Sequence, residues 1–334
     1  MNMLSNDRHP LLNRVETTNP DHALTATDRP LLAVFLLLIL PLLIGTTIAP
    51  YVFNGMRALA EHTDLFPKLL NSRFEKVASR CVMIVAALLR YQVLRLTGLL
   101  PDIRRGLSRS RDRYRDLGWG VAVGCLSIIA LYAFGWLVGA YVVSPKYHGL
   151  ADLAGRFAVS ILGAVIIGFF EETFFRGFIF GALRVRLGFF TALLFSSLFF
   201  SAIHFFRPLY PEMIEHAAWN SGYALIPHLF DKFVWPRDLS FALTLFIIGL
   251  TLATFYHKRG NLYLIIGLHG GWVLAMQTGA RVFDRQREVL PLWFGHGDLV
   301  SKGLLAVAVI SVFLIAAILH QPKTANQNRS RAYT

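Results

Sequence analysis

The sequence predicts an all-α membrane protein, a polytopic bundle of about eight transmembrane helices, and three observations lead to this fold class. Of the 334 residues, 55% are hydrophobic and only 16% are charged, whereas soluble domains average about 25% charged residues. The mean hydropathy is +0.51. The apolar residues also gather into runs of the ~18 or more residues that are typical of membrane spans.

Eight segments are predicted to cross the membrane, because at ~1.5 Å per residue each approaches the ~30 Å thickness of a bilayer core. Arg80 and Arg90 lie inside the second segment, so the alternative for that segment is an interfacial helix whose arginines reach the headgroups. The eight segments are Leu31–Phe53, Lys76–Leu94, Gly118–Val143, Phe157–Phe180, Gly188–Phe206, Leu239–His257, Leu262–Gly279 and Gly303–His320.

The distribution of positive charge predicts the orientation in the membrane. The net charge is +13, and the densest cluster of arginines lies between Arg104 and Arg115, so this loop is expected to be cytoplasmic. Residues 207–238 and 280–302 mix both signs and are expected outside. With eight spans both termini are then cytoplasmic, in what we expect to be a bacterial inner (plasma) membrane. The apolar content assigns the basic surface to the lipid bilayer, and no nucleic acid is expected as a partner.

One apolar segment ends in two adjacent carboxylates, Glu171 and Glu172, followed by Arg176. Ionisable residues at membrane depth are costly and indicate a functional site. Glu172 and Arg176 are four residues apart on one helix face and can form an ion pair. Glu171 is rotated by about 100° from that face and is available to act on a water molecule. The alternative is that both glutamates are structural partners of buried arginines.

Two histidines lie on other apolar segments. His204 follows Phe199-Phe200-Ser201-Ala202-Ile203, and His269 is flanked by Gly267, Gly270 and Gly271. Taken alone, each histidine is more simply explained as a core residue, and the glycines as sites of close helix packing. Together with the glutamates they place a base, a second acid or base, and a donor or metal ligand on three helices that a bundle can bring together.

The motifs Glu171-Glu172-x-x-x-Arg176, Phe200-x-x-x-His204 and His269, in this order within roughly residues 157–280, resemble those of the CPBP family of intramembrane proteases. This family is also called the ABI family and includes the type II CAAX prenyl endopeptidases. The resemblance implies that Glu171 is the catalytic glutamate that activates water. It also implies that His204 is the partner of Glu171, that His269 binds the oxyanion, and that Glu172 and Arg176 brace the site.

The same resemblance leaves the cofactor open between none and a divalent metal such as zinc. If the enzyme is metal-dependent, the implied ligands are Glu171, His204 and His269, an acceptable catalytic zinc set. One departure concerns the third motif, which in the family is often His-x-x-x-Asn. Val273 occupies the asparagine position and cannot donate a hydrogen bond to an oxyanion. Trp272 and Gln277 are the nearby polar substitutes.

The predicted organisation of the chain follows from this resemblance. It comprises a polar tail (1–30), N-terminal spans with a basic cytoplasmic loop (31–150), a CPBP-like catalytic core (151–280), an outer loop with the last span (281–320) and a second polar tail (321–334).

The predicted function is hydrolysis of peptide bonds in membrane-associated proteins or peptides. The alternatives are a non-catalytic scaffold or bacteriocin-immunity protein and a proton-coupled transporter. Other protease classes match poorly, because the chain has no His-Glu-x-x-His and its one Gly-x-Gly-Asp match, residues 295–298, falls in a polar loop.

Overall fold

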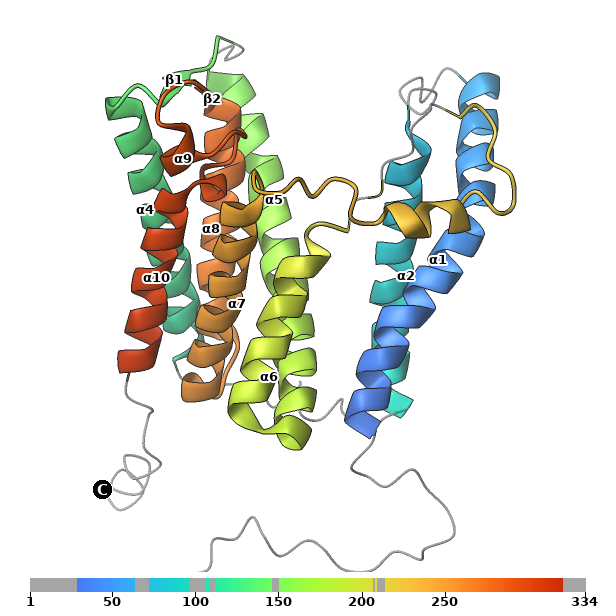
Figure 1. Cartoon of the computed structure of the whole chain (residues 1–334), viewed down its shortest axis with the longest axis horizontal. Coiled ribbons are helices and arrows are strands. Elements are labelled where there is room, and N and C mark those ends of the chain that lie inside the picture. Colours follow the sequence, from blue (N-terminus) through green and yellow to red (C-terminus); the bar gives the residue numbers. More distant parts are fainter. Residues whose placement is uncertain are drawn as a thin grey trace, which may run out of the picture.

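The computed structural model describes residues 29–63, 72–96, 106–107, 112–145, 150–206, 208 and 214–320. Within these ranges nearly all regular structure is helical, and the long helices run roughly along one common direction (Figure 1). The fold is therefore the predicted all-α bundle. The long helices are α1 (Arg29–His62), α2 (Phe74–Leu96), α4 (Arg113–Leu137), α5 (Leu150–Phe174), α6 (Gly181–Ile203), α7 (Leu239–Arg259), α8 (Tyr263–Val282) and α10 (Leu304–Leu319).

The predicted membrane segments coincide with these eight helices. The helical stretches that are long and apolar enough to cross a bilayer number five among the described residues, and one of them, Ala154–Ile203, holds two of the predicted segments. Phe74–Leu96 is among them, which favours a span over an interfacial helix for the second segment. α8 carries polar groups, and α10 is a shorter apolar helix of 16 residues. Together these helices identify an integral membrane protein.

The chain reverses direction at Gly188, inside one continuous helical run. This glycine has φ +75° and ψ 175°, a backbone conformation that side-chain-bearing residues rarely adopt. The two arms pack against each other, with ring centroids 6.1 Å apart for Phe180 and Phe189 and 5.0 Å apart for Phe175 and Phe200. The first arm includes a π-helical turn, Phe175–Phe180, all of whose residues are buried. Two antiparallel spans thus form without an intervening loop.

The third predicted segment, Gly118–Val143, extends too far. Helix α4 ends at Leu137, and Gly139 has φ +75°, which turns the chain out of the helix. The extended residues that follow form strand β1 (Tyr141–Val143), which pairs antiparallel with β2 (Phe283–Arg285) after α8. This two-stranded ladder closes one end of the bundle. A short helix α9 (Pro291–Phe294) lies near the same end (Figure 1).

Helix α8 packs closely against α4 and α5. A Cβ atom at Gly271 would lie 2.5 Å from the Val121 carbonyl oxygen of α4, so the two backbones meet at a distance that only glycine permits. The main hydrophobic cluster surrounds this contact and includes Leu268, Trp272, Phe178 and Phe200. The residues on α8 are therefore held at the centre of the bundle.

Helices α1 and α2 stand beside the other helices as a pair (Figure 1). They share a separate hydrophobic cluster that contains Phe53 and Phe74, with ring centroids 5.4 Å apart. The segment after α6 completes this cluster with Ala217 and Leu225. The Asn54 side chain also forms two hydrogen bonds with the Ala217 backbone, each of 2.9 Å. The pair is attached to the rest of the chain both by this segment and by residues of the main hydrophobic cluster, Ala33 and Leu37 of α1 and Val93 and Leu94 of α2.

The two ends of the bundle differ in the loops that they carry. The α5–α6 turn, the end of α7 and the starts of α4 and α8 share one end, whereas the segments before α7 and before α10 lie at the other (Figure 1). This division matches the predicted sorting of loops to two membrane faces. Half of the basic loop from Arg104 to Arg115 lies outside the described residues, as do the tails 1–28 and 321–334.

Candidate active site

Glu172 is the centre of a buried polar group between α5 and α8. Its side chain is fully buried, and its Oε1 atom accepts a hydrogen bond from Arg176 Nη1 at 2.8 Å. The same oxygen lies 2.7 Å from Nδ1 of His269, on α8. Arg176 is also nearly inaccessible, with 2% of its side chain exposed. One carboxylate therefore neutralises a buried guanidinium and fixes the orientation of an imidazole on another helix.

Glu171 differs from its neighbour, because 29% of its side chain is exposed. Its Oε2 atom lies 3.9 Å from His269 Nε2, beyond direct hydrogen-bond distance but within reach of a bridging water. Within the described part of the chain, this oxygen is buried and has no hydrogen-bond partner. Glu171 thus presents an acceptor atom that the fold does not use, on the opposite side of His269 from Glu172.

His204 joins this group through the Phe200 ring. Its Nδ1 atom is 2.7 Å from the Phe200 carbonyl oxygen, one helical turn earlier. The Phe200 ring lies 4.7 Å from the His204 ring and 6.1 Å from the His269 ring, centroid to centroid. The Arg176 guanidinium carbon lies 4.3 Å from the centroid of the same ring, a favourable cation–π distance. Phe200 is therefore the contact that the arginine and both histidines share.

Close packing of the helices sets these distances. Gly168, one turn before Glu172, lies against Gly270, the residue after His269; a Cβ at Gly168 would be 3.1 Å from the Gly270 Cα. On the other side, the reversal at Gly188 returns α6 along the π-helical turn and brings Phe200 onto Phe175. π-helical turns occur frequently at functional sites. The site is therefore built from α5, the π-helical turn, α6 and α8.

The structure therefore links all five predicted site residues. Glu171, Glu172, Arg176 and His269 form one polar group, and His204 contacts it through Phe200. The group brings two carboxylates, one guanidinium and one imidazole together, and the Arg176 guanidinium neutralises the fully buried carboxylate of Glu172.

The residues after His269 do not replace the missing asparagine. Val273 is buried and has no polar side-chain atom. The Trp272 ring N–H donates to Ser127 of α4 at 3.1 Å, on another side of α8. The Gln277 amide lies against Gly163 of α5, about 12 Å along the helix from His269.

The ligands that the family resemblance implies for a metal are Glu171, His204 and His269. The Nδ1 atom of His269 is bonded to Glu172 and that of His204 to the Phe200 carbonyl, so the Nε2 atom of each ring is the one left for a ligand role. Among the described residues, however, no three His, Cys, Asp or Glu side chains are grouped so that they could hold a metal ion. In this arrangement the three residues do not fit a three-ligand site.

Two contributions were missed by sequence reasoning. The anchoring of His269 by Glu172 depends on how α5 is rotated against α8, and no spacing within one helix encodes that rotation. The Phe200 contact had a local signal, because Phe200 and His204 are four residues apart on one helix face. A third contact comes from α2, where Arg90 Nη1 donates to the Phe170 carbonyl oxygen at 3.3 Å, next to Glu171.

Residues 153–275 match the family model described as type II CAAX prenyl endopeptidase Rce1-like. The match agrees with the resemblance of the sequence motifs to the CPBP family, which includes the type II CAAX prenyl endopeptidases. The Rce1-like segment runs from the first turn of α5 into α8 and contains all five site residues. Its family indicates an endopeptidase of the CAAX-protease type. No curated protein and no solved structure matches the chain.

Proposed function

We propose that this protein is an intramembrane endopeptidase that hydrolyses peptide bonds of membrane-associated proteins or peptides, with Glu171 as the general base. The proposal rests on the different surroundings of the two glutamates. Glu172 is fully buried and bonded to Arg176 and His269, whereas Glu171 is partly exposed and has an unused oxygen 3.9 Å from His269 Nε2.

The proposed reaction begins with a water molecule bound at the Glu171 carboxylate. Glu171 accepts a proton from this water as the water oxygen forms a bond to the carbonyl carbon of the substrate. The carbonyl oxygen becomes an oxyanion in the tetrahedral intermediate. The C–N bond then breaks, and the proton held by Glu171 passes to the leaving amine. Glu171 is ionised again at the end of the cycle, so no other reactant is consumed.

His269 is proposed to stabilise the oxyanion. Its Nδ1–H donates to the Glu172 carboxylate, so in the protonated ring the Nε2–H points to the side on which Glu171 lies. A fixed cationic donor in a site shielded from water stabilises developing negative charge strongly. His204 is proposed to orient the water or the substrate, with its ring fixed by the Phe200 carbonyl and the Phe200 ring.

The substrate class proposed from the family description is a prenylated C-terminal peptide. A direct test uses the full-length protein in lipid vesicles and a quenched fluorescent peptide with a C-terminal CAAX sequence, either farnesylated or unmodified. We expect the wild type to cleave the farnesylated peptide and the Glu171→Gln variant to lose ~10²–10⁴-fold in rate. Glu288→Gln, the same change at an exposed position before α9, is the matched control and should be unaffected.

Each other result has a defined meaning. Cleavage of both peptides at similar rates would support peptidase activity but would reject a requirement for the prenyl group. Equal cleavage by the wild type and Glu171→Gln would reject Glu171 as the base. If the folded wild type cleaves neither peptide, a comparison of peptide termini in the membranes of cells that express the wild type or Glu171→Gln searches for natural substrates. Identical termini, with the biological effect of the protein retained in the variant, would favour a non-catalytic scaffold.

A further inference from the structure

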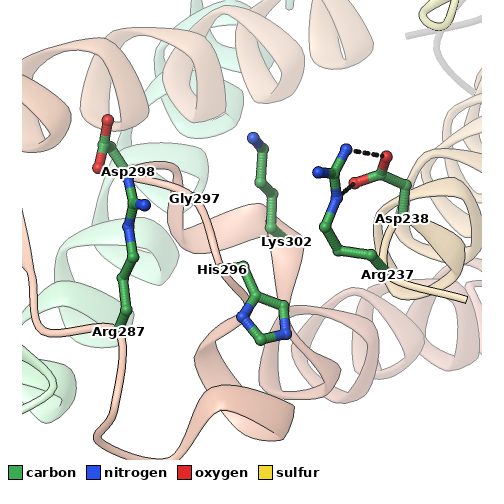
Figure 2. Close-up of a pocket in the computed structure, with 7 residues that line it drawn as sticks. All are labelled: Arg237, Asp238, Arg287, His296, Gly297, Asp298 and Lys302. Carbon is green, nitrogen blue, oxygen red and sulfur yellow. Dashed lines mark hydrogen bonds and ion pairs between the residues drawn. The ribbon is translucent and has the colours of Figure 1, made fainter. Parts of the chain in front are cut away.

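A charged pocket lies at the end of the bundle where α7 and α10 begin. Its volume is about 480 Å³. It shares no residue with the group around Glu172. Three separate segments line it: the residues before α7, the loop after β2, and the residues between α9 and α10 (Figure 2). The charged and titratable residues that line it are Arg237, Asp238, Arg287, His296, Asp298 and Lys302.

Cations exceed anions in this pocket. Arg237 is matched by Asp238 through two hydrogen bonds, of 2.8 and 3.1 Å. Within the described residues, Arg287 and Lys302 have no carboxylate at ion-pair distance, and Asp298 is the remaining acidic residue. The charged side chains therefore sum to one positive charge, or two when His296 is protonated. In Figure 2 the Lys302 side chain extends between the Arg237–Asp238 pair and the side occupied by Arg287 and Asp298.

The local backbone accommodates the Lys302 side chain. A Cβ atom at Gly297 would overlap the end of that side chain, so glycine at this position leaves the space that the ammonium group occupies. Burial raises the pKa of the neighbouring Asp238, but the Arg237 and Val234 hydrogen bonds and the charges of Arg237 and Lys302 outweigh this and lower it overall. Asp238 is therefore ionised at neutral pH and remains committed to Arg237.

Two helix N-termini add to the positive potential. Lys302 directly precedes Gly303, the N-terminal flanking residue of α10, and Asp238 has the same place before α7. Neither flanking residue caps its helix with a side-chain hydrogen bond. The N-terminus of a helix carries a partial positive charge. This charge and the cationic side chains favour the same kind of ligand, an anion.

The surroundings place the pocket at the depth of lipid headgroups. Its lining residues lie directly before α7 and between α9 and α10, and these elements meet at one end of the long apolar helices (Figure 1). Exposed aromatic side chains flank it: Trp235 is 69% exposed and Trp293 is 49% exposed. Tryptophan gathers at the boundary between headgroups and acyl chains. An anion at this depth that is available to the pocket in a membrane is the phosphate of a phospholipid.

We propose that this pocket binds the phosphate group of an anionic phospholipid headgroup, with Arg287 and Lys302 as the principal contacts. The phosphate oxygens accept hydrogen bonds from the guanidinium and ammonium groups, and the acyl chains lie along the exposed apolar surface beside Trp235 and Trp293. The bound lipid links the loop after β2 to the starts of α7 and α10 and stabilises this end of the bundle.

The test measures thermal stability of the full-length protein in a neutral detergent. Three additives are compared: short-chain phosphatidylglycerol, short-chain phosphatidylcholine and inorganic phosphate. We expect phosphatidylglycerol to raise the Tm in a saturable manner and phosphatidylcholine to leave it unchanged. In the Arg287→Gln/Lys302→Gln variant, half-saturation should need roughly tenfold more lipid, because two charged hydrogen bonds are lost. Lys76→Gln/Lys232→Gln removes two exposed lysines and is the control for net charge.

The outcomes separate the sources of the phosphate. A Tm rise with inorganic phosphate equal to that with phosphatidylglycerol would assign the pocket to free phosphate instead of a lipid. Equal responses of the wild type and the Arg287/Lys302 variant would overturn the proposal, as would an equal loss in the control variant. If the double variant has a lowered Tm without additives, the lipid response is measured instead with the single variant Arg287→Gln, which changes an exposed residue. A lipid response of Arg287→Gln equal to that of the wild type would also overturn the proposal.

Discussion

The group around Glu172 and the pocket around Lys302 both collect charged side chains from segments that are distant in sequence, but they differ in compensation. Glu172, Arg176 and His269 are between 0% and 8% exposed, and each is bonded to another member of the group. Around Lys302 the side chains remain accessible and the cations are in excess. Where the protein removes charge from solvent it neutralises that charge internally, and where solvent remains it leaves charge for a ligand. The following predictions test this difference, beginning with the largest expected effect.

Glu172→Gln should destabilise the protein by about 3–5 kcal/mol, because it leaves the Arg176 guanidinium buried without a counterion. The measurement is unfolding in detergent, followed by circular dichroism. Glu171→Gln is the control, since the Glu171 carboxylate is partly exposed and neutralises no buried arginine at contact distance. A Glu172→Gln protein as stable as the control would show that Arg176 finds compensation elsewhere.

Arg176→Lys keeps the charge but should cost about 2–3 kcal/mol. A lysine cannot reproduce the planar contact with Phe200 together with the 2.8 Å hydrogen bond to Glu172. The matched change in the pocket around Lys302, Arg287→Lys, should leave the unfolding midpoint unchanged, because Arg287 is exposed. Similar losses in both variants would erase the contrast between the two clusters.

Tyr141 is a buried titratable group at the end of the bundle that carries β1 and β2. Burial raises the pKa of its hydroxyl from 10.0 to about 12, with a smaller opposing effect of Arg285. The folded state thus binds the proton more tightly than the unfolded state. Stability is retained below pH 10 and falls as the pH rises from 10 to 12, by about 2 kcal/mol.

Unfolding of wild type and Tyr141→Phe at several pH values provides the measurement. The phenylalanine variant cannot ionise and should lose less stability over that interval. Parallel curves for the two proteins would mean that other groups cause the alkaline loss.

Asp238→Asn should have the smallest effect, below about 1 kcal/mol, because Asp238 is paired with an arginine whose side chain is 49% exposed, and solvent screens such a pair. The pKa of Asp238 is lowered in the folded state, so its contribution is present above the ordinary carboxyl pKa and is lost as the pH falls below it. A chemical denaturation series from pH 7 to acid for both proteins should show this small difference converging. A loss of stability as large as that of Glu172→Gln would show that the pocket around Lys302 also depends on internally neutralised charge.

The sequence predicted the helices well because apolar length is a local property. It placed Glu171, Glu172, Arg176 and His269 in the correct helical segments, whereas His204 directly follows the last residue of α6. The Glu172–Arg176 pair was predictable for the same reason, as both residues lie on one helix face. The hydrogen-bond partner of His269 was not predictable. Which of the two glutamates faces His269 depends on how α5 is rotated about its axis, and the contact of Gly168 with Gly270 fixes that rotation. The strand β1 was missed because its partner β2 lies more than a hundred residues away in the sequence.

The pocket around Lys302 was beyond sequence reasoning for a related reason. The pattern Gly295-His296-Gly297-Asp298 matches a protease motif but lies in a polar loop. Its position beside Arg237 and Arg287 arises only when the starts of α7 and α10 are brought together. Charged residues in loops carry little periodicity, so a cluster drawn from three loops has no signature within any one of them.

The separate hydrophobic cluster of α1 and α2 has a consequence for how the protein is made. Phe53 and Phe74 emerge early, but Ala217 and Leu225, which complete the cluster, are synthesised after three further helices. At ~5–20 residues per second, Ala217 follows the end of α2 by roughly 6 to 24 seconds. We therefore expect the first hairpin to enter the bilayer before the segment that completes its cluster has been synthesised, so that this attachment is a late step of biogenesis.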